Sequence, residues 1–514
     1  MTLGLTALTH GLSPSLIEAD EGAHYVNALF LGDWIRAGLP SPLAFARAFY
    51  GHFPRLTIGH WPPGWYMLEA PLFAAWRPSP LGAAYLSAFL SGLPGAVIVW
   101  AFAQVGRMRA GLALGLAYAL LPLVVDSARY LLVDQPLALA VELAAMAWFA
   151  ASGRPSWTRM LGFALLAAAC PLIKGNGALV ALVPAIDIAL TGRWRLLRQP
   201  SLWGAAMLAL VIVGPWYWLS FAISAQGFNY APGLPYAWLA LTANGQAILA
   251  NLGVPGVLLV LAAAPSFGHG AAPDERRIAK LALSVFLATL IFQSAIPASL
   301  APRYVSPALP WLVILAGLGL HHLAKVPRAG RSVAVVMGAL ALVPAAMALH
   351  SLPPKPDLRA PQLAQAMVRH GGLWLVDGRS GAEGALVAQG AYADEGRNQL
   401  WVGRASQWLS TSDFMGRGYR LTAGDPAAVR AVLDRVGAAG AISVALHHQL
   451  AFPHSRLLAA AVNTPAYSST RSSFAAGDGD VLVANRRTTI APNLAVLAAD
   501  SGSAKVAKMT DALR

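Results

Sequence analysis

The 514-residue sequence has little charge and almost no cysteine. Only 12% of the residues are Asp, Glu, Lys or Arg, well below the roughly one quarter of soluble domains, and 57% are hydrophobic. This balance excludes an ordinary soluble globular protein. The single cysteine, Cys170, excludes an internal disulfide, so any exported domain must be held together by its hydrophobic core.

Acidic residues are scarcer than basic ones, 23 against 37, which gives a formal net charge of +14. The basic residues occur in short clusters between apolar segments, where Lys and Arg set the orientation of membrane helices. This distribution argues against a nucleic-acid partner and favours the lipid bilayer as the surrounding of the protein.

Long apolar runs dominate the sequence from Pro80 onward. A membrane helix needs roughly 20 apolar residues, and ten segments come close to that length. They lie at residues 80–104, 110–126, 135–151, 158–173, 176–191, 201–223, 246–265, 281–297, 304–320 and 332–349. The pattern predicts a polytopic α-helical membrane protein with about 10 to 11 transmembrane helices.

The N-terminus lacks a segment of this kind. Residues 1–16 contain no Lys or Arg, and their apolar run is too short for a signal peptide or a membrane helix. We therefore expect either a misassigned start or a reading frame that extends upstream of Met1 with roughly 20 apolar residues.

The loops between the apolar segments alternate in charge. One set carries basic clusters: Arg107 and Arg109; Arg154 and Arg159; Arg193, Arg195 and Arg198; Arg276 and Arg277; Lys325, Arg328 and Arg331. The positive-inside rule places this set in the cytoplasm. The other set holds isolated cations and faces outward, together with residues 18–79 and everything after His350.

These features divide the chain into four regions. Residues 1–79 form an N-terminal segment with an extracytoplasmic acidic loop and an aromatic interfacial helix over 64–76, and residues 80–350 form the transmembrane bundle. Residues 351–487 follow a Pro-rich linker, alternate predicted strands and helices, and indicate a small extracytoplasmic α/β domain. Residues 488–514 are predicted to be a disordered tail.

The C-terminal domain lacks a Gly-rich phosphate loop, a Cys/His metal-ligand spacing and a nucleophile elbow. Its adjacent histidines, His447 and His448, are predicted to be surface residues rather than ligands. The chemistry of the protein is therefore expected in the outward loops of the membrane region.

Carboxylates occur in two of these loops. Asp20 and Glu21 are adjacent, and they are compatible with an ordinary helix start because acids favour first helical turns. Asp134 follows Arg129 by five residues, and this pair is equally compatible with a local salt bridge. Glu142 lies inside a predicted membrane helix, where an acid is costly and therefore suggests a function.

Besides Arg129, two isolated cations complete the outward face. Lys174 and Arg303 each stand alone in their loop, and each is also compatible with a side chain that snorkels to the membrane surface. Carboxylates and cations at one membrane face suit transfer from an anionic, lipid-linked donor. A carboxylate would take a proton from the acceptor, and the cations would neutralise the leaving phosphate.

Five motifs carry a resemblance to a known family. DEGAHY, HWPP, ARYLLVDQPLAL, IKGNGALVALVP and PRYVSPALP occur in this order within residues 18–324. In this order they resemble the GT-C glycosyltransferases of the protein O-mannosyltransferase and lipid A aminoarabinose transferase type, which are similar to glycosyltransferase family 39. The resemblance implies a polyprenyl-phosphate sugar donor and inverting transfer to an extracytoplasmic protein, lipid or glycan, with the enzyme in the bacterial inner membrane.

The resemblance also implies roles for particular residues. Asp20 matches the loop carboxylate proposed as base, and Asp134 matches the acid of the second loop. Beside the resemblance, we expect Glu21 to aid Asp20 as its neighbour. Lys174 and Arg303 match positions near the donor phosphate.

Arg129 and His60 are further candidates for phosphate contact. His60 is included because the aminoarabinose transferases have a lysine directly before the Pro-Pro pair, where this sequence has Trp61.

A divalent metal, Mg²⁺ or Mn²⁺, held by Asp20, Glu21 or Asp134 is compatible with the pattern, although too few ligands cluster to require one. No other cofactor is expected.

Two other classes of function fit part of the sequence. A transporter or flippase of lipid-linked glycans would use the same cations without breaking a bond, but no internal repeat is evident. A structural membrane protein whose external domain binds a partner would explain that domain and leave the acidic loop without a role.

Overall fold

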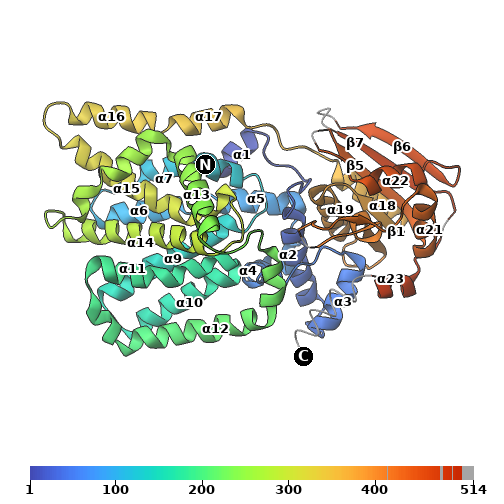
Figure 1. Ribbon diagram of the computed structural model, residues 1–514, viewed down its shortest axis with the longest axis horizontal. Coiled ribbons are helices and arrows are strands. Elements are labelled where there is room, and N and C mark those ends of the chain that lie inside the picture. The colour runs from blue at the N-terminus through green and yellow to red at the C-terminus, as the bar shows by residue number, and fades with distance from the viewer. Residues whose placement is uncertain (414, 448, 475–478, 489, 501–514) are drawn as a thin grey trace.

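The computed structural model describes residues 1–514 except 414, 448, 475–478, 489 and 501–514. A helical bundle occupies one end of an elongated molecule, and a mixed α/β domain occupies the other (Figure 1). Helices α2 (Glu21–Arg36) and α3 (Pro42–His52) lie between these two parts. The acidic loop that precedes α2 is therefore at the junction of the bundle and the domain.

The remaining helices before the C-terminal domain follow one another with short connections. Their bounds are α1 Thr2–Leu8, α4 Gly64–Trp76, α5 Pro80–Leu90, α6 Gly95–Gln104, α7 Met108–Tyr118, α8 Pro122–Ser127, α9 Asp134–Gly153, α10 Trp157–Ile173, η1 Gly175–Ala181, α11 Leu182–Thr191, η2 Trp194–Arg198, α12 Pro200–Ser224, η3 Ala225–Gly227, α13 Leu234–Leu261, η4 Ala264–Phe267, α14 Pro273–Ala295, η5 Pro302–Ala308, α15 Leu309–Ala324, α16 Gly330–Leu340 and α17 Val343–Ser351.

Seven helices among the described residues are long and apolar enough to cross a membrane. They cover Pro80–Gln104, Asp134–Gly153, Pro200–Gly227, Leu234–Leu261, Pro273–Ala295, Pro302–Ala324 and Gly330–Ser351. Each of them overlaps a predicted segment. The predicted multi-pass, α-helical membrane fold is therefore confirmed.

The other three predicted segments are shorter or interrupted. Segments 158–173 and 176–191 correspond to the shorter apolar helices Trp157–Ile173 and Gly175–Thr191. The single helix predicted over 110–126 is wrong, because α7 ends at Tyr118 and α8 begins at Pro122. Proline has no N–H to continue the hydrogen-bond ladder, so the chain starts a new helix there.

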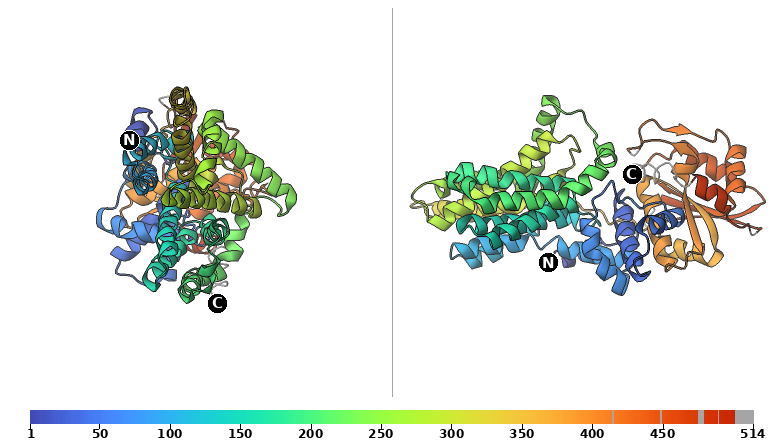
Figure 2. Two further views of the ribbon diagram at one scale, coloured as in Figure 1. Left: turned by 90° about the vertical axis from the view of Figure 1, so that its left-hand side faces the viewer. Right: turned by 90° about the horizontal axis from the view of Figure 1, so that it is seen from below.

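The bundle helices run roughly along the long axis of the molecule (Figures 1 and 2). The α11–α12 and α15–α16 connections, which carry predicted cytoplasmic Arg and Lys clusters, lie at the end of the bundle away from the C-terminal domain (Figure 1). The acidic loop and the C-terminal domain share the opposite end.

Helix α4 forms over residues 64–76, the range expected for an interfacial helix. It packs closely along α2, where a Cβ atom on Gly32 would meet Phe73 Cβ at 2.6 Å. Its buried face, Tyr66, Glu69, Ala70 and Phe73, is turned inward, and Met67, Leu68 and Trp76 are exposed. The exposed apolar side chains are those that a membrane surface would cover.

The C-terminal domain is a five-stranded mixed sheet with helices packed against it (Figure 1). The strand order is β2-β1-β5-β7-β6, with β1 parallel to β2 and β5, and with β7 antiparallel to β5 and β6. The bounds are α18 Ala360–His370, β1 Gly372–Asp377, α19 Ser380–Ala393, β2 Leu400–Arg404, α20 Ala405–Trp408, β3 Ser410–Thr411, β4 Arg420–Leu421, α21 Pro426–Val436, β5 Ala438–Leu446, α22 Pro453–Ala461, β6 Tyr467–Ser473, β7 Gly479–Arg486 and α23 Leu494–Asp500.

The predicted α/β character of this domain is confirmed, although its tail is more ordered than expected. Helix α23 lies within the predicted disordered region, and Leu497 packs into the second hydrophobic core. Asn493 joins this helix to α21 through a bond from its amide to Arg435 O at 3.2 Å. Residues 494–500 of the region predicted to be disordered thus form a helix, and residues 501–514 lie outside the described residues.

Candidate functional site

The turn before α2 gathers carboxylates beside a cation from η5. Asp20 is the N-cap residue of α2, and its backbone N–H donates to Glu18 Oε2 at 2.6 Å. The guanidinium nitrogens of Arg303 lie 3.6 Å from Glu18 Oε1 and 3.3 Å from Asp20 Oδ2. A residue about 280 positions away in the sequence, Arg303, thus pairs with both acids of this turn.

A second ion pair adjoins the first. Asp134 begins α9 and Lys174 follows the last residue of α10, so each charge is favoured by the dipole of its helix. Lys174 Nζ donates to Asp134 Oδ1 at 2.6 Å, and both side chains are buried. Arg303 Nε lies 3.6 Å from Asp134 Oδ2 and joins the two pairs. We call Glu18, Asp20, Asp134, Lys174 and Arg303 the charge cluster.

Aromatic rings surround the lysine of the charge cluster. Lys174 Nζ lies 4.7 Å from the ring centroid of Tyr304 and 5.6 Å from that of Trp61. An aromatic face attracts an ammonium group while excluding water from it. Trp61, which replaces the lysine of the aminoarabinose transferases, therefore contributes a surface for Lys174 instead of a charge of its own.

Two titratable groups at the site are shifted by burial. Burial raises the pKa of Glu18 to about 7, and the neighbouring Asp20 carboxylate adds to the rise. Burial lowers the pKa of His24 to about 4, so the imidazole, which shares a hydrogen bond of 2.7 Å with the Tyr66 hydroxyl, is neutral at pH 7. The site thus holds a carboxyl that exchanges a proton near neutral pH beside Asp20.

Glu21 lies outside the charge cluster, although it follows Asp20 in the sequence. Its carboxylate is fully buried and is bound by Lys355 Nζ at 2.6 Å. Glu21 Oε1 also accepts from Leu131 N, and Oε2 accepts from Glu18 N, both at 2.9 Å. The structure therefore gives Glu21 a different place from the one expected: it ties the acidic turn to the linker of the C-terminal domain.

Arg129 belongs to the same linker contacts. Its buried guanidinium donates to Pro353 O, and its own carbonyl accepts from Lys355 Nζ at 2.9 Å. In the described part of the chain, no ion pair joins Arg129 to the charge cluster. Arg129 is thus held against the linker of the C-terminal domain, and its contact with a donor phosphate stays a prediction.

His60 packs edge-on against Trp61, with 5.3 Å between the ring centroids. Burial lowers the pKa of His60, so the ring is neutral near pH 7. A neutral imidazole can donate a hydrogen bond to a phosphate but cannot supply the cation that the sequence comparison expected at this corner.

The set proposed for a divalent metal, Asp20, Glu21 and Asp134, does not converge. Asp20 and Asp134 are paired with Arg303, and Glu21 is bound by Lys355. Within the described residues, the three-residue group with metal-ligand geometry is instead Asp377, Glu383 and His454 in the C-terminal domain. That buried group could hold a metal ion.

Glu142 is fully buried within α9, and neither of its carboxyl oxygens has a hydrogen-bond partner among the described residues. The structure therefore supplies no partner to support a function for this acid.

The C-terminal domain contacts the acidic turn directly. Its helix α19 lies beside α2, the helix that follows this turn (Figure 1). A Cβ atom on Gly381 would lie 1.7 Å from Ile17 O, and one on Gly22 would lie 2.5 Å from the carbonyl carbon of Gly384. Only glycines permit this approach. The domain thereby helps to hold the backbone that carries Glu18 and Asp20.

Three residues of the site were missed by reasoning from the sequence. Glu18 precedes the conspicuous Asp20-Glu21 pair, Tyr304 follows Arg303 directly, and Lys355 stands in the Pro-rich linker. Glu18 and Tyr304 could have been found as neighbours of singled-out residues, whereas no local pattern marks Lys355.

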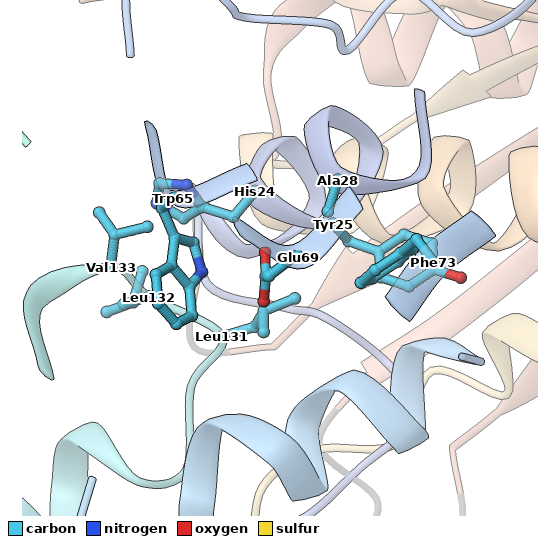
Figure 3. Close-up of a pocket in the computed structure, with 9 residues that line it drawn as sticks. All are labelled: His24, Tyr25, Ala28, Trp65, Glu69, Phe73, Leu131, Leu132 and Val133. Carbon is cyan, nitrogen blue, oxygen red and sulfur yellow. The ribbon is translucent and has the colours of Figure 1, made fainter. Parts of the chain in front are cut away.

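A small pocket lies beside the charge cluster, between α2, α4 and the loop before α9 (Figure 3). Glu69 on α4 points into it beside Trp65 and Leu131, and His24 from α2 lines the same pocket. Burial raises the pKa of Glu69 to about 8, although a hydrogen bond with Trp65 opposes the rise. Glu69 is therefore largely protonated at pH 7.

We expect the substitution Glu69→Gln to stabilise the protein, and increasingly so as the pH rises. The folded state keeps the Glu69 proton up to a pKa of about 8, whereas the unfolded chain loses it near 4.5, so wild-type stability falls between these values. Gln has no such ionisation. Thermal unfolding in detergent should show equal melting temperatures at low pH and a higher one for the variant at alkaline pH. The exposed Glu395→Gln is the matched control, and identical pH profiles for Glu69→Gln and wild type would contradict the expectation.

Comparisons with known proteins bear on this site. The family model described as dolichyl-phosphate-mannose-protein mannosyltransferase matches residues 70–218. Comparison with curated proteins finds no match.

Solved structures share the fold of the whole chain. ArnT from Cupriavidus metallidurans, bound to undecaprenyl phosphate, is similar with a TM-score of 0.56 and 16% identity over 96% of this chain and 98% of that one. The apo state of the same protein gives a TM-score of 0.52 at 16% identity, over 94% and 97%. The oligosaccharyltransferase AglB from Archaeoglobus fulgidus, in complex with an inhibitory peptide and a dolichol-phosphate, gives 0.54 at 11% identity, over 95% and 74%.

The family match lies in the helical bundle, and the shared folds extend over the C-terminal domain. The predicted resemblance to GT-C glycosyltransferases of the protein O-mannosyltransferase and ArnT type is thereby confirmed. The protein shares the polytopic helical fold of these solved structures and carries a C-terminal α/β domain.

Proposed function

We propose that the protein transfers a sugar from a polyprenyl-phosphate donor to an extracytoplasmic acceptor, with inversion at the sugar carbon. The observation that carries this proposal is the charge cluster, in which Lys174 and Arg303 adjoin Asp20 and Asp134 at the domain end of the bundle. Such a cluster combines a proton acceptor with cations for a phosphate.

The reaction is a direct displacement. The acceptor hydroxyl oxygen attacks the anomeric carbon of the donor, and Asp20 takes the hydroxyl proton. The bond between that carbon and the phosphate oxygen breaks, and polyprenyl phosphate leaves with the electron pair. The phosphate gains negative charge as the bond breaks, so Lys174 and Arg303 stabilise it most at the transition state.

Asp134 positions these cations. Its Oδ1 accepts a hydrogen bond from Lys174 Nζ at 2.6 Å, and its Oδ2 lies 3.6 Å from Arg303 Nε. Both cations are therefore oriented before the donor binds. Preorganised charges need no rearrangement at the moment of reaction, which is why such pairing favours catalysis.

The similar structures of ArnT and AglB hold undecaprenyl phosphate and dolichol-phosphate, and these lipid carriers support the proposed donor class. We further propose that the protein lies in a bacterial inner membrane, with the charge cluster and the C-terminal domain on the extracytoplasmic side. This orientation follows from the basic loops at the opposite end of the bundle. The acceptor class is a protein, a lipid or a glycan.

The experiment that tests this function measures bond cleavage. Purified full-length protein in nanodiscs, supplied with synthetic polyprenyl-phosphate sugars and an envelope extract as acceptor source, should release polyprenyl phosphate and add one sugar mass to an acceptor. A transporter of lipid-linked glycans would bind the same donors and leave them intact. Intact donor in every reaction, with donor binding detected, would overturn the transferase in favour of the transporter.

A further inference from the structure

A second group of buried polar side chains lies in the C-terminal domain, apart from the charge cluster. Asp377 ends β1, Glu383 lies in the first turn of α19, and His454 lies in the first turn of α22. All three side chains are buried, and one ligand atom from each lies within 4.8 Å of the others. Three elements of the fold thus converge on one point.

One ring nitrogen of His454 faces the Asp377 carboxylate at this point. Its Nδ1 shares a hydrogen bond of 2.8 Å with the Tyr419 hydroxyl. Its Nε2 is buried 3.2 Å from Asp377 Oδ1, but it forms no hydrogen bond with any described residue. A buried nitrogen that makes no hydrogen bond is costly, and an imidazole whose other nitrogen is hydrogen-bonded is oriented as metal-binding histidines are.

The two carboxylates are oriented by hydroxyl and amide groups that leave lone pairs free. Asp377 accepts one hydroxyl bond on each oxygen, from Ser443 at 2.5 Å and from Ser455 at 2.9 Å. Glu383 Oε2 accepts from Arg404 Nε and Ser406 Oγ, whereas among the described residues Oε1 accepts from Ser406 N alone, at 2.9 Å. Each acid therefore has an oxygen that can take a further partner.

The spacing between His454 and Asp377 suits a small tetrahedral cation. Zinc binds imidazole nitrogen and carboxylate oxygen at about 2.0 to 2.2 Å, so two ligand atoms on one ion lie about 3.3 Å apart. The separation of His454 Nε2 and Asp377 Oδ1, 3.2 Å, agrees with this value. Arg404 balances the charge of Glu383, whereas no described Lys or Arg pairs with Asp377.

We propose that Asp377, Glu383 and His454 bind one zinc ion in the C-terminal domain. The ion would join α19 to β1 and α22. Because α19 also carries Gly381 and Gly384, which contact the acidic turn, the ion would stabilise the support of the charge cluster. It would take no part in the transfer step.

The test measures zinc on the full-length chain, purified without a histidine tag and stripped with a chelator. After incubation with zinc chloride and removal of the excess, elemental analysis should find one zinc per wild-type chain. His454→Gln should lose most of that zinc, whereas His447→Gln, which changes an exposed histidine of the same domain, should keep it. Zinc should also raise the melting temperature of the wild type and of His447→Gln but not of His454→Gln.

Two further results discriminate the location of the ion. The Asp20→Asn variant should retain the zinc. If Asp20→Asn loses the zinc and His454→Gln retains it, the metal lies at the acidic turn and the proposal is overturned. If His454→Gln fails to fold, X-ray absorption of the zinc-loaded wild type decides. One imidazole with oxygen ligands is expected, and two histidines, a sulfur ligand or no bound zinc would contradict the site.

Discussion

Asp20→Asn is expected to lower turnover by about 100-fold or more, the scale on which a general base contributes. The amide keeps the shape of the side chain and its place opposite Arg303, but it cannot accept the acceptor proton. Expression and donor binding should change little, because Lys174, Arg303 and Asp134 are untouched. Turnover of a purified lipid donor, compared at saturating donor concentration, measures the effect.

The neighbouring acid complicates this test in a predictable way. Glu18 lies in the same turn, and burial raises its pKa to about 7, so it can take over part of the proton transfer. Glu18→Gln alone should cost less than Asp20→Asn, and the double variant should cost most. Wild-type turnover in the double variant would show that this turn is structural and would move the base to Asp134.

The second large effect concerns stability and the fully buried pair of Glu21 and Lys355. Replacing Glu21 by Gln leaves the Lys355 charge buried without its counter-ion, and breaking such a pair costs about 3 to 5 kcal/mol. Glu21→Gln should therefore unfold at a much lower temperature or denaturant concentration than the wild type. Because Glu21 lies outside the charge cluster, the folded fraction should still transfer sugar.

A double-mutant cycle isolates this pair. Lys355→Met alone should also destabilise the protein, and Glu21→Gln with Lys355→Met should recover much of the loss because no unpaired charge is then buried. Asp413→Asn, which breaks the exposed pair with Arg417, is the matched control and should change stability little. Additive losses in the double variant would show that the two side chains do not depend on each other.

Much of the site could be predicted because charge is scarce in this sequence. Isolated ionisable residues in otherwise apolar outward loops have few roles, and counting basic loops assigned Asp20, Asp134, Lys174 and Arg303 to one face. The structure brings these four together. The prediction succeeded because it depends on the topology alone: all four residues lie at helix ends, and these helix ends share one end of the bundle.

Contacts over long sequence distances could not be predicted. Glu21 and Lys355 are 334 residues apart, and nothing local to the linker distinguishes Lys355 from any solvated lysine. The adjacency of Asp20 and Glu21 suggested a shared role, but successive residues at a helix start point in different directions. Their side chains therefore reach different partners, Arg303 and Lys355.

The fold errors have similar causes. The apolar run 110–126 looks continuous in composition, and the break depends on where Pro122 stands in the hydrogen-bond ladder. Strand β6, Tyr467–Ser473, was not predicted, because it is an edge strand of mostly exposed polar residues and shows no hydrophobic alternation. Helix α23 is stabilised by the packing of Leu497 into a hydrophobic core that other segments of the domain form, so its own sequence does not predict it.

The most direct test of the proposed donor site is a cryo-electron microscopy structure of the full chain in nanodiscs with bound polyprenyl phosphate. We expect the phosphate oxygens within hydrogen-bond distance, about 2.7 to 3.2 Å, of Lys174 Nζ and the Arg303 guanidinium, with Asp20 facing the adjacent space. Phosphate density that contacts neither cation, and lies for example against Arg77 or Arg129, would contradict the assignment of the charge cluster as the site of transfer.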